Sequence, residues 1–150
     1  MYNNLIDLLI MILPIFSITL TANKFPIDIS IYKPVFQPPK WVFPIVWTYI
    51  LLSLGIITNT ALFKAENKLL IYSIYSILVI LLNIWLIINY YKYYKIGFYI
   101  LIITTYISII YCILLSNHGN NIYYLIPMPF WLVIASCLNS VIYDRITMFY

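Results

Sequence analysis

Apolar residues run almost without interruption through five long stretches of this chain, and short polar breaks separate them. The stretches cover about residues 3–22, 41–63, 68–91, 96–116 and 122–147. The hydrocarbon core of a bilayer is about 30 Å thick, so a helix needs about 20 apolar residues to cross it. The pattern therefore predicts an all-α membrane protein, a five-transmembrane-helix bundle that forms one domain over residues 1–150.

The polar breaks predict how these helices connect. "KAENK", "YKYYK" and "SNHGNN" are short, so the helices that each joins should be antiparallel neighbours, and only the connection at 23–40 is long. Loops rich in Lys and Arg stay in the cytoplasm. Six of the eight basic residues fall on the side that carries the long loop and the C-terminus. We therefore expect a cytoplasmic C-terminus and an N-terminus outside.

Composition supports a multi-pass integral membrane protein in contact with lipid. Hydrophobic residues make up 65% of the chain and charged residues 8%, against about 25% charged in soluble domains. The net charge of +4 is scattered, so no nucleic-acid partner is expected. No charged residue lies in the middle of a predicted helix, which argues against a proton pump, an ion-coupled transporter or a voltage sensor.

Polar residues inside the predicted helices recur at helical spacing and mark the expected interior faces. They are Ser76, Asn83 and Tyr90 in the third helix, Thr104, Ser108 and Tyr111 in the fourth, and Ser136, Asn139 and Tyr143 in the fifth. The simplest role for these side chains is hydrogen bonding between helices.

Side chains suited to catalysis or metal binding are sparse. No set of nucleophile, base and orienting group is present, and the only histidine, His118, lies in the predicted loop "SNHGNN". Cys112 and Cys137 lie singly in apolar segments without CxxC spacing. The sequence predicts no metal site and no resident cofactor.

Aromatic residues gather instead where the second and fifth helices are expected to begin. Phe43 and Trp47 are four residues apart and share one helical face, close to Trp41. Trp131 precedes Ala135 on one stripe, and the small residue leaves space that a flat apolar molecule could fill. Tryptophans near helix ends also form interfacial belts. Trp41 fits that anchoring role, and both roles stay open for Trp47 and Trp131.

Prolines mark the entry to the second helix. Pro38 and Pro39 lack N–H groups, so they fit just before or within a first helical turn. Because residues before proline are held extended, the segment from Lys33 to Pro39 should be a stiff cap over the cytoplasmic mouth of the bundle.

Three stretches resemble the TspO/MBR family of tryptophan-rich sensory proteins and translocator proteins, also called peripheral-type benzodiazepine receptors. "KPVFQPPKWVFPIVW" at 33–47 is similar to the family signature, and "PMPFWLVIASCLNSVIYDR" at 127–145 is similar to its fifth helix. Asn83, the pair Tyr90–Tyr91 and Gly97–Phe98 form a third similar block. The resemblance extends from about residue 14 to residue 145.

The resemblance implies a five-helix bundle whose pocket opens toward the long loop, and a homodimer. Members of this family bind porphyrins such as protoporphyrin IX and haem. The ligand-binding positions of the family fall here on Phe43, Trp47, Asn83, Phe98, Trp131, Ala135 and Leu138. Phe36 stands where animal members have tryptophan, which indicates a bacterial inner membrane.

Three functions are compatible with the resemblance. The first is a receptor or sensor that binds tetrapyrroles, and the second is an enzyme that degrades porphyrin with light and oxygen, using Trp47 and Trp131. The third is a transporter of porphyrin or sterol. A sterol-binding pattern is formally met by Leu138, Tyr143 and Arg145.

The chain departs from the family pattern at several positions that affect the pocket. Pro44 replaces a common glycine, Ser140 replaces a common aromatic residue, and Leu86 stands where the family usually has tryptophan. Trp85 comes one residue earlier in the chain than that tryptophan.

Overall fold

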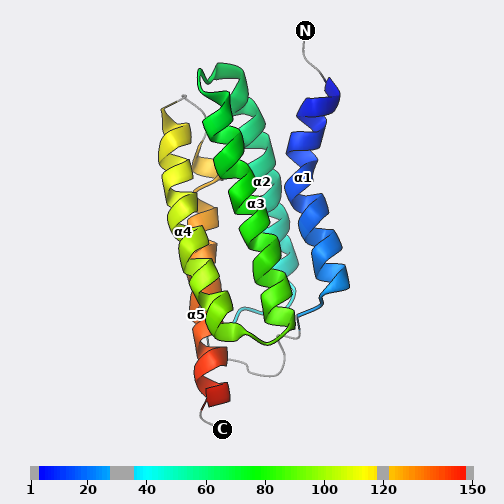
Figure 1. Ribbon diagram of the computed structural model, residues 1–150, viewed down its shortest axis with the longest axis vertical. Helices are drawn as coiled ribbons and strands as arrows, with labels where there is room; N and C mark the ends of the chain where they lie inside the picture. The colour runs from blue at the N-terminus through cyan, green and yellow to red at the C-terminus, as the bar shows by residue number, and fades with distance from the viewer. Residues whose placement is uncertain (1–3, 28–35, 118–121, 148–150) are drawn as a thin grey trace.

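A computed structural model of the chain describes residues 4–27, 36–117 and 122–147, which are called the described residues below. They form five long α-helices and one short 3-10 helix, which confirms the predicted all-α fold (Figure 1). The α-helices are α1 (Asn4–Lys24), α2 (Val42–Lys64), α3 (Lys68–Tyr90), α4 (Tyr94–Ser116) and α5 (Pro127–Thr147), and the 3-10 helix η1 is Ile122–Tyr124.

Successive helices run in opposite directions, so the N-terminus and the C-terminus lie at opposite ends of the bundle (Figure 1). Helix α1 packs against α2 and α3, α3 packs against α4, and α4 packs against α5. The α2 and α5 helices touch more sparsely and close the ring in the order α1, α2, α5, α4, α3.

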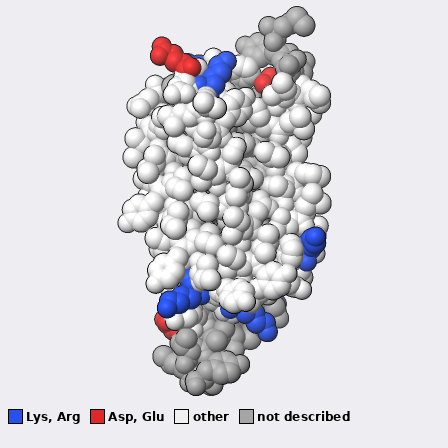
Figure 2. Space-filling model, in the orientation of Figure 1, with Lys and Arg blue, Asp and Glu red and all other residues white. Residues whose placement is uncertain are grey.

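The outer surface suits a bilayer. All five long helices are long and apolar enough to cross a membrane, and charged side chains lie toward the two ends with an uncharged surface between them (Figure 2). Lys24, Lys40, Lys92 and Lys95 lie where α1 and α3 end and where α2 and α4 begin, whereas Lys64 and Lys68 lie at the opposite end. Lys33, His118 and the side chain of Arg145, which entered the sequence-based predictions, lie outside the described residues.

Helix α1 packs closely on α2 and α3 at two places, one next to Pro14 and the other at Gly55. Pro14 has no N–H to donate to the Ile10 carbonyl one turn earlier. The buried Tyr75 hydroxyl of α3 donates to that carbonyl instead, at 2.5 Å. On α2, Gly55 lies so close to α1 that an added Cβ would collide with the Met11 carbonyl oxygen. The absence of a side chain at Gly55 therefore permits the close contact between α1 and α2.

A second buried tyrosine, Tyr111, fills space near the centre of the bundle. Tyr111 of α4 and Thr58 of α2 are both fully buried, and their hydroxyl oxygens lie 2.7 Å apart in a hydrogen bond. The Thr58 hydroxyl also lies 2.6 Å from the Leu54 carbonyl in its own helix. Together with Tyr75, these groups fill the interior with rings whose polar ends are satisfied.

Two sequence-based predictions need correction. The fifth helix was expected from residue 122 but begins at Pro127, because Pro127 and Pro129 suit a first turn, where N–H groups have no partner within the helix. Trp131 consequently lies one turn inside α5.

The predicted interior face of α3 is also wrong in part, because Ser76 and Tyr90 are exposed. A stripe of mostly apolar residues faces inward in their place: Ile71, Tyr75, Leu78, Leu82, Leu86 and Asn89. The predicted face of α4 is confirmed by the burial of Thr104, Ser108 and Tyr111. On α5, Ser136 and Asn139 are buried as predicted, whereas Tyr143 is only half-buried.

Candidate ligand-binding site

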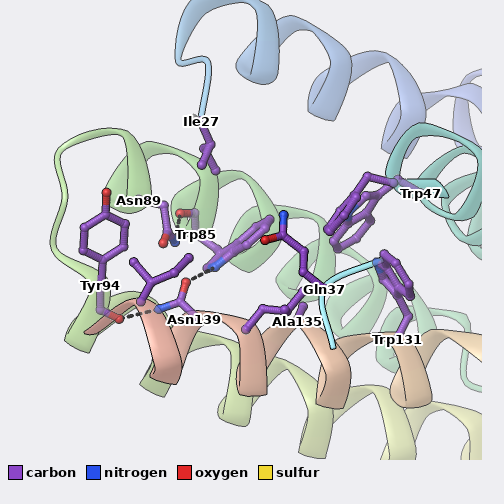
Figure 3. Close-up of a pocket in the computed structure, with 12 residues that line it drawn as sticks. Ile27, Gln37, Trp47, Trp85, Asn89, Tyr94, Trp131, Ala135 and Asn139 are labelled. Carbon is purple, nitrogen blue, oxygen red and sulfur yellow. Dashed lines mark hydrogen bonds between the residues drawn. The ribbon is translucent and has the colours of Figure 1, made fainter. Parts of the chain in front are cut away.

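A cavity of about 70 Å³ lies between α2, α3, α4 and α5, in the half of the bundle that contains the end of α1 and the start of α2 (Figure 3). Two residues of the connection between α1 and α2, Ile27 and Gln37, complete its wall. The helices contribute the remaining lining residues: Phe43, Trp47, Trp85, Asn89, Tyr94, Trp131, Ala135, Leu138, Asn139 and Ile142.

Large rings make up much of the cavity wall, and they are packed in two pairs. Trp47 of α2 stacks on Trp85 of α3, with ring centroids 5.8 Å apart and ring planes inclined by 29°. Phe43 of α2 meets Trp131 of α5 edge to face, at 5.5 Å and 70°. The two pairs join α2 to α3 and to α5. They present flat apolar surfaces to the cavity, and flat aromatic molecules stack on such surfaces.

A chain of hydrogen bonds forms the polar part of the wall. The Trp85 indole N–H donates to the Asn139 side-chain oxygen at 3.4 Å, and the Asn139 amide donates to the Tyr94 backbone carbonyl. The Asn89 amide donates to the Trp85 carbonyl at 2.8 Å (Figure 3). Because Asn89 packs directly on Gly97, a side chain at that position would collide with it. The Trp85 ring is therefore held by the Asn139 side chain of α5 and by its stacking on Trp47 of α2.

The indole N–H of Trp131, unlike that of Trp85, has no hydrogen-bond partner among the described residues. Trp131 is only 7% exposed. Leaving a buried donor unpaired costs about 1–3 kcal/mol. Such groups are rare in folded proteins and call for an explanation.

A second, larger cavity adjoins the first. It is a groove of about 440 Å³ between α1, α2 and α3, lined by residues such as Ile18, Ala22, Leu51 and Leu86. The groove and the smaller cavity share four wall residues: Ile27, Phe43, Trp47 and Trp85. The Trp47–Trp85 stack therefore stands between the two spaces.

The structure brings together five of the seven residues that the resemblance assigned to ligand binding. Phe43, Trp47, Trp131, Ala135 and Leu138 all line the smaller cavity.

Asn83 and Phe98 line neither of the two cavities. The Asn83 amide donates to the Ser17 hydroxyl at 3.3 Å and to the Val79 carbonyl at 2.8 Å, and the Thr21 hydroxyl donates to the Asn83 oxygen. Asn83 thus fastens α1 to α3.

The two described side chains of the sterol pattern, Leu138 and Tyr143, do not line a common cavity. Leu138 lines the cavity, whereas the Tyr143 ring lies 5.9 Å below the Lys95 ammonium group at the end of the bundle.

Five polar or aromatic wall residues were missing from the predicted site: Gln37, Trp85, Asn89, Tyr94 and Asn139. The sequence signal for Trp85 was its shift by one position from the usual family tryptophan. Asn139 was recognised as interior, but its partner Trp85 could not be identified from spacing within α5. Asn89 lies four residues after Trp85, which was the available signal that the two side chains share a face.

The two walls limit what the site can do chemically. Among their described residues there is no carboxylate, imidazole, thiol or ammonium group. The aromatic and aliphatic side chains of these walls suit binding by apolar burial and stacking, and Tyr94 adds one phenol to the smaller cavity.

Comparison with known protein families agrees with this geometry. A comparison with curated proteins finds no match. The family model described as the TspO/MBR family matches residues 6–144, nearly the whole chain and all five long helices. On this match, the chain belongs to the TspO/MBR family of membrane proteins.

Proposed function

We propose that this membrane protein is a receptor for tetrapyrroles such as protoporphyrin IX or haem, or for similar flat apolar ligands, and that it binds them inside the bundle. The observation that carries the proposal is the concentration of rings at one site. Phe43, Trp47, Trp85 and Trp131 converge on one cavity from α2, α3 and α5. Membership of the family fits a receptor or a transporter of apolar ligands equally well.

Size determines how such a ligand would fit. Sites for small molecules typically measure about 300–1,000 Å³, so the 70 Å³ cavity is too small for a whole tetrapyrrole. The adjoining groove of 440 Å³ is within that range and shares Phe43, Trp47 and Trp85 with the cavity. The macrocycle would therefore lie in the groove against Trp47, and one edge of it would reach the smaller cavity.

A porphyrin titration tests the proposal. Protoporphyrin IX is added to the purified protein in detergent, and the Kd is obtained from the shift in porphyrin absorbance and the quenching of tryptophan fluorescence. We expect Trp47→Ala to weaken binding about 10-fold or more, because both stacking and burial are lost.

Trp41→Ala is the matched control, since Trp41 is 65% exposed and lines neither of the two cavities. Equal affinities of wild type and a folded Trp47→Ala variant would remove the site assignment.

The same complex distinguishes receptor from enzyme. Under illumination in air, a receptor leaves the porphyrin absorbance unchanged, whereas a degrading enzyme consumes it and slows when Trp47 is replaced by Phe. The packing of Trp47 on Trp85 favours the enzyme alternative, because it places two oxidisable rings in contact beside the proposed ligand position.

We also propose that the cavity end of the bundle faces the cytoplasm. Four described lysines lie at that end and two at the other, in line with the positive-inside rule. In a chain with Cys112 and Cys137 replaced by Ala, an impermeant maleimide added to intact cells should label Asn67→Cys and spare Lys92→Cys. The opposite labelling would reverse the orientation.

A further inference from the structure

We propose that one surface, at the bundle end where α1 and α3 finish, binds the phosphate headgroup of an anionic phospholipid. This ring–lysine surface consists of Lys24, Phe25, Tyr90, Tyr91 and Lys92. Of these five residues, only Phe25 lines either of the two cavities. The inference does not depend on the proposed function, because it concerns a lipid of the surrounding bilayer and not a ligand inside the bundle.

Three rings in mutual contact form the centre of the ring–lysine surface. The Phe25 ring, which directly follows α1, lies 5.4 Å from the Tyr90 ring and 6.3 Å from the Tyr91 ring at the end of α3. The two tyrosine rings are 5.2 Å apart and inclined by 78°. Tyr90 is 43% exposed and Tyr91 is 57% exposed. Such tyrosines suit the headgroup level of a bilayer, which accommodates both an apolar ring and a polar hydroxyl.

Lysines lie next to these rings in both α1 and the turn after α3. The Lys24 ammonium group lies over the Phe25 ring, 5.6 Å from its centroid. The exposed Lys92 directly follows Tyr91. Because the Phe25 ring contacts the Tyr91 ring, the two cations are brought to one cluster from different parts of the chain.

Lys92 occupies a backbone position that favours glycine. It has a φ of 64°, the one positive φ at a non-glycine among the described residues. Its N–H donates to the Asn89 carbonyl and the Tyr93 N–H donates to the Ile88 carbonyl, at 3.0 and 3.1 Å. This pair of bonds ends a helix and usually has glycine in the place of Lys92. Residues held in such strained conformations gather at functional sites, which supports a role for the Lys92 side chain.

The charges at this end of the bundle favour an anion. Among the described residues, Asp144 is the acidic one here, whereas Asp7 and Glu66 lie at the opposite end. Asp144 follows Tyr143, the ring on which Lys95 lies, so Lys95 is not counted in the surface. Figure 2 shows basic side chains at this end, bordering the uncharged surface that suits the acyl chains.

A phospholipid fits this surface better than a soluble anion does. Lys24 and Lys92 are exposed and line neither of the two cavities, so a free phosphate would stay hydrated and salt would screen its attraction. A lipid is already held beside the protein by its acyl chains. Both helices expose large apolar side chains nearer the middle of the membrane, such as Leu20 of α1 at 54% and Ile84 of α3 at 38%.

Lipid titration of the delipidated protein in detergent tests the inference. Native mass spectrometry gives the Kd of the first bound lipid for phosphatidylglycerol and for phosphatidylcholine with the same acyl chains. We expect wild type to bind phosphatidylglycerol at least about fivefold more tightly, because one lysine near a membrane surface contributes about that factor toward an anionic lipid. In Lys24→Gln/Lys92→Gln the ratio of the two Kd values should fall to near one.

Lys64→Gln/Lys68→Gln is the matched control. It makes the same change of charge at the opposite end of the bundle, where Glu66 lies between the two lysines in the chain. The preference for phosphatidylglycerol should remain in this variant.

Lys92→Gly separates the charge of Lys92 from its effect on the fold. Glycine adopts a positive φ without strain, so this variant should unfold at a higher temperature than wild type when no lipid is added. Its affinity for phosphatidylglycerol should nevertheless fall about fivefold. A purely structural role of Lys92 predicts the first result without the second.

Three outcomes would overturn the inference. Wild type could bind both lipids equally. The preference could survive in Lys24→Gln/Lys92→Gln, because the anionic lipid then binds elsewhere. Soluble glycerol phosphate could displace phosphatidylglycerol, which would make a free anion the partner of this surface. Each of these results leaves the proposal of porphyrin binding standing, since no porphyrin is present.

Discussion

Two halves of the same bundle use large rings in opposite ways. In the closed half, defined by Ile10, Gly55, Thr58, Tyr75 and Tyr111, the rings belong to tyrosines, and each hydroxyl is paired with a group from another helix. In the cavity half, defined by Phe43, Trp47, Trp85, Trp131 and Asn139, the rings line an open space. The buried N–H of Trp131 has no hydrogen-bond partner among the described residues.

The difference shows what turns an apolar core into a site. A tyrosine places its polar atom at the end of the ring, where it can reach a carbonyl freed by a proline or a hydroxyl on a neighbouring helix. A tryptophan carries its N–H on the side of a wider ring, so rigid indoles that meet one another leave gaps and depend on well-placed acceptors. Ala135 widens the gap further, because it provides little side chain opposite these rings.

The largest effect is expected from adding one methyl group to the closed half. In Gly55→Ala the new Cβ would collide with backbone atoms of Met11, which cannot rotate away. Helix α1 must move, and we expect a loss of about 2–3 kcal/mol in unfolding free energy, measured by thermal or SDS-induced unfolding in detergent. Ile56→Ala is the control, because Ile56 is adjacent but 43% exposed. A fully stable Gly55→Ala variant would mean that α1 and α2 are not closely packed.

A smaller effect is expected from removing one hydroxyl in the same half. Tyr75→Phe leaves the Ile10 carbonyl without a partner, and hydrogen bonds inside membranes contribute about 0.6 kcal/mol and at most about 1.7. Pro14→Ala restores an N–H to the helix, so Tyr75→Phe should cost less in that background. Unfolding of the two single variants and the double variant measures this coupling. Equal costs in both backgrounds would show that the hydroxyl does not compensate for the proline.

The closed half and the cavity half also differ in how well the sequence predicts them. The five helices follow from the length of the apolar stretches, and the rings of α2 and α5 follow from their position near helix starts. The inward face of α3 does not follow. In a bilayer both the lipid and the interior are apolar, so hydrophobic periodicity separates them poorly. Ser76 and Tyr90 were therefore assigned to the interior although they are exposed.

Trp85 illustrates a second limit of sequence analysis. A shift of one residue turns a side chain by about 100° around a helix, so a tryptophan one position early is expected to point away from a family pocket. In the structure Trp85 nevertheless stacks on Trp47, while Leu86 is buried in the adjoining groove. Which of the two positions faces the cavity depends on how α3 is rotated against α2 and α5, and contacts between helices set that rotation.

The Asn83→Ala variant tests whether Asn83 links two helices or binds the ligand. Its hydrogen bonds to Ser17, Thr21 and Val79 make it a link between α1 and α3. Asn83→Ala should therefore lower the unfolding free energy by about 1 kcal/mol and change the Kd for protoporphyrin IX by less than about threefold. Strongly weakened porphyrin binding at unchanged stability would instead make Asn83 a ligand residue, as the family resemblance implies.

The smallest effect is expected from the other glycine contact, which lies in the cavity half. In Gly97→Ala the added Cβ would be 2.6 Å from the Asn89 side-chain nitrogen, and this atom, unlike the Met11 backbone, can swing away at the cost of its bond to Trp85. Alanine also favours the helix over glycine by about 0.8–1.0 kcal/mol, which offsets much of that loss. We therefore expect stability within about 0.5 kcal/mol of wild type.

Gly55→Ala and Gly97→Ala together compare the packing of the two halves with the same chemical change. Each variant adds one methyl group at a buried helical glycine, so helix propensity cancels between them and the neighbouring atoms account for the rest. If Gly97→Ala proves as damaging as Gly55→Ala in the same unfolding measurement, Asn89 has no room to move, and the cavity half is as rigid as the closed half. A rigid cavity half could not widen for a tetrapyrrole, so that single result would also count against ligand entry past the Trp47–Trp85 stack.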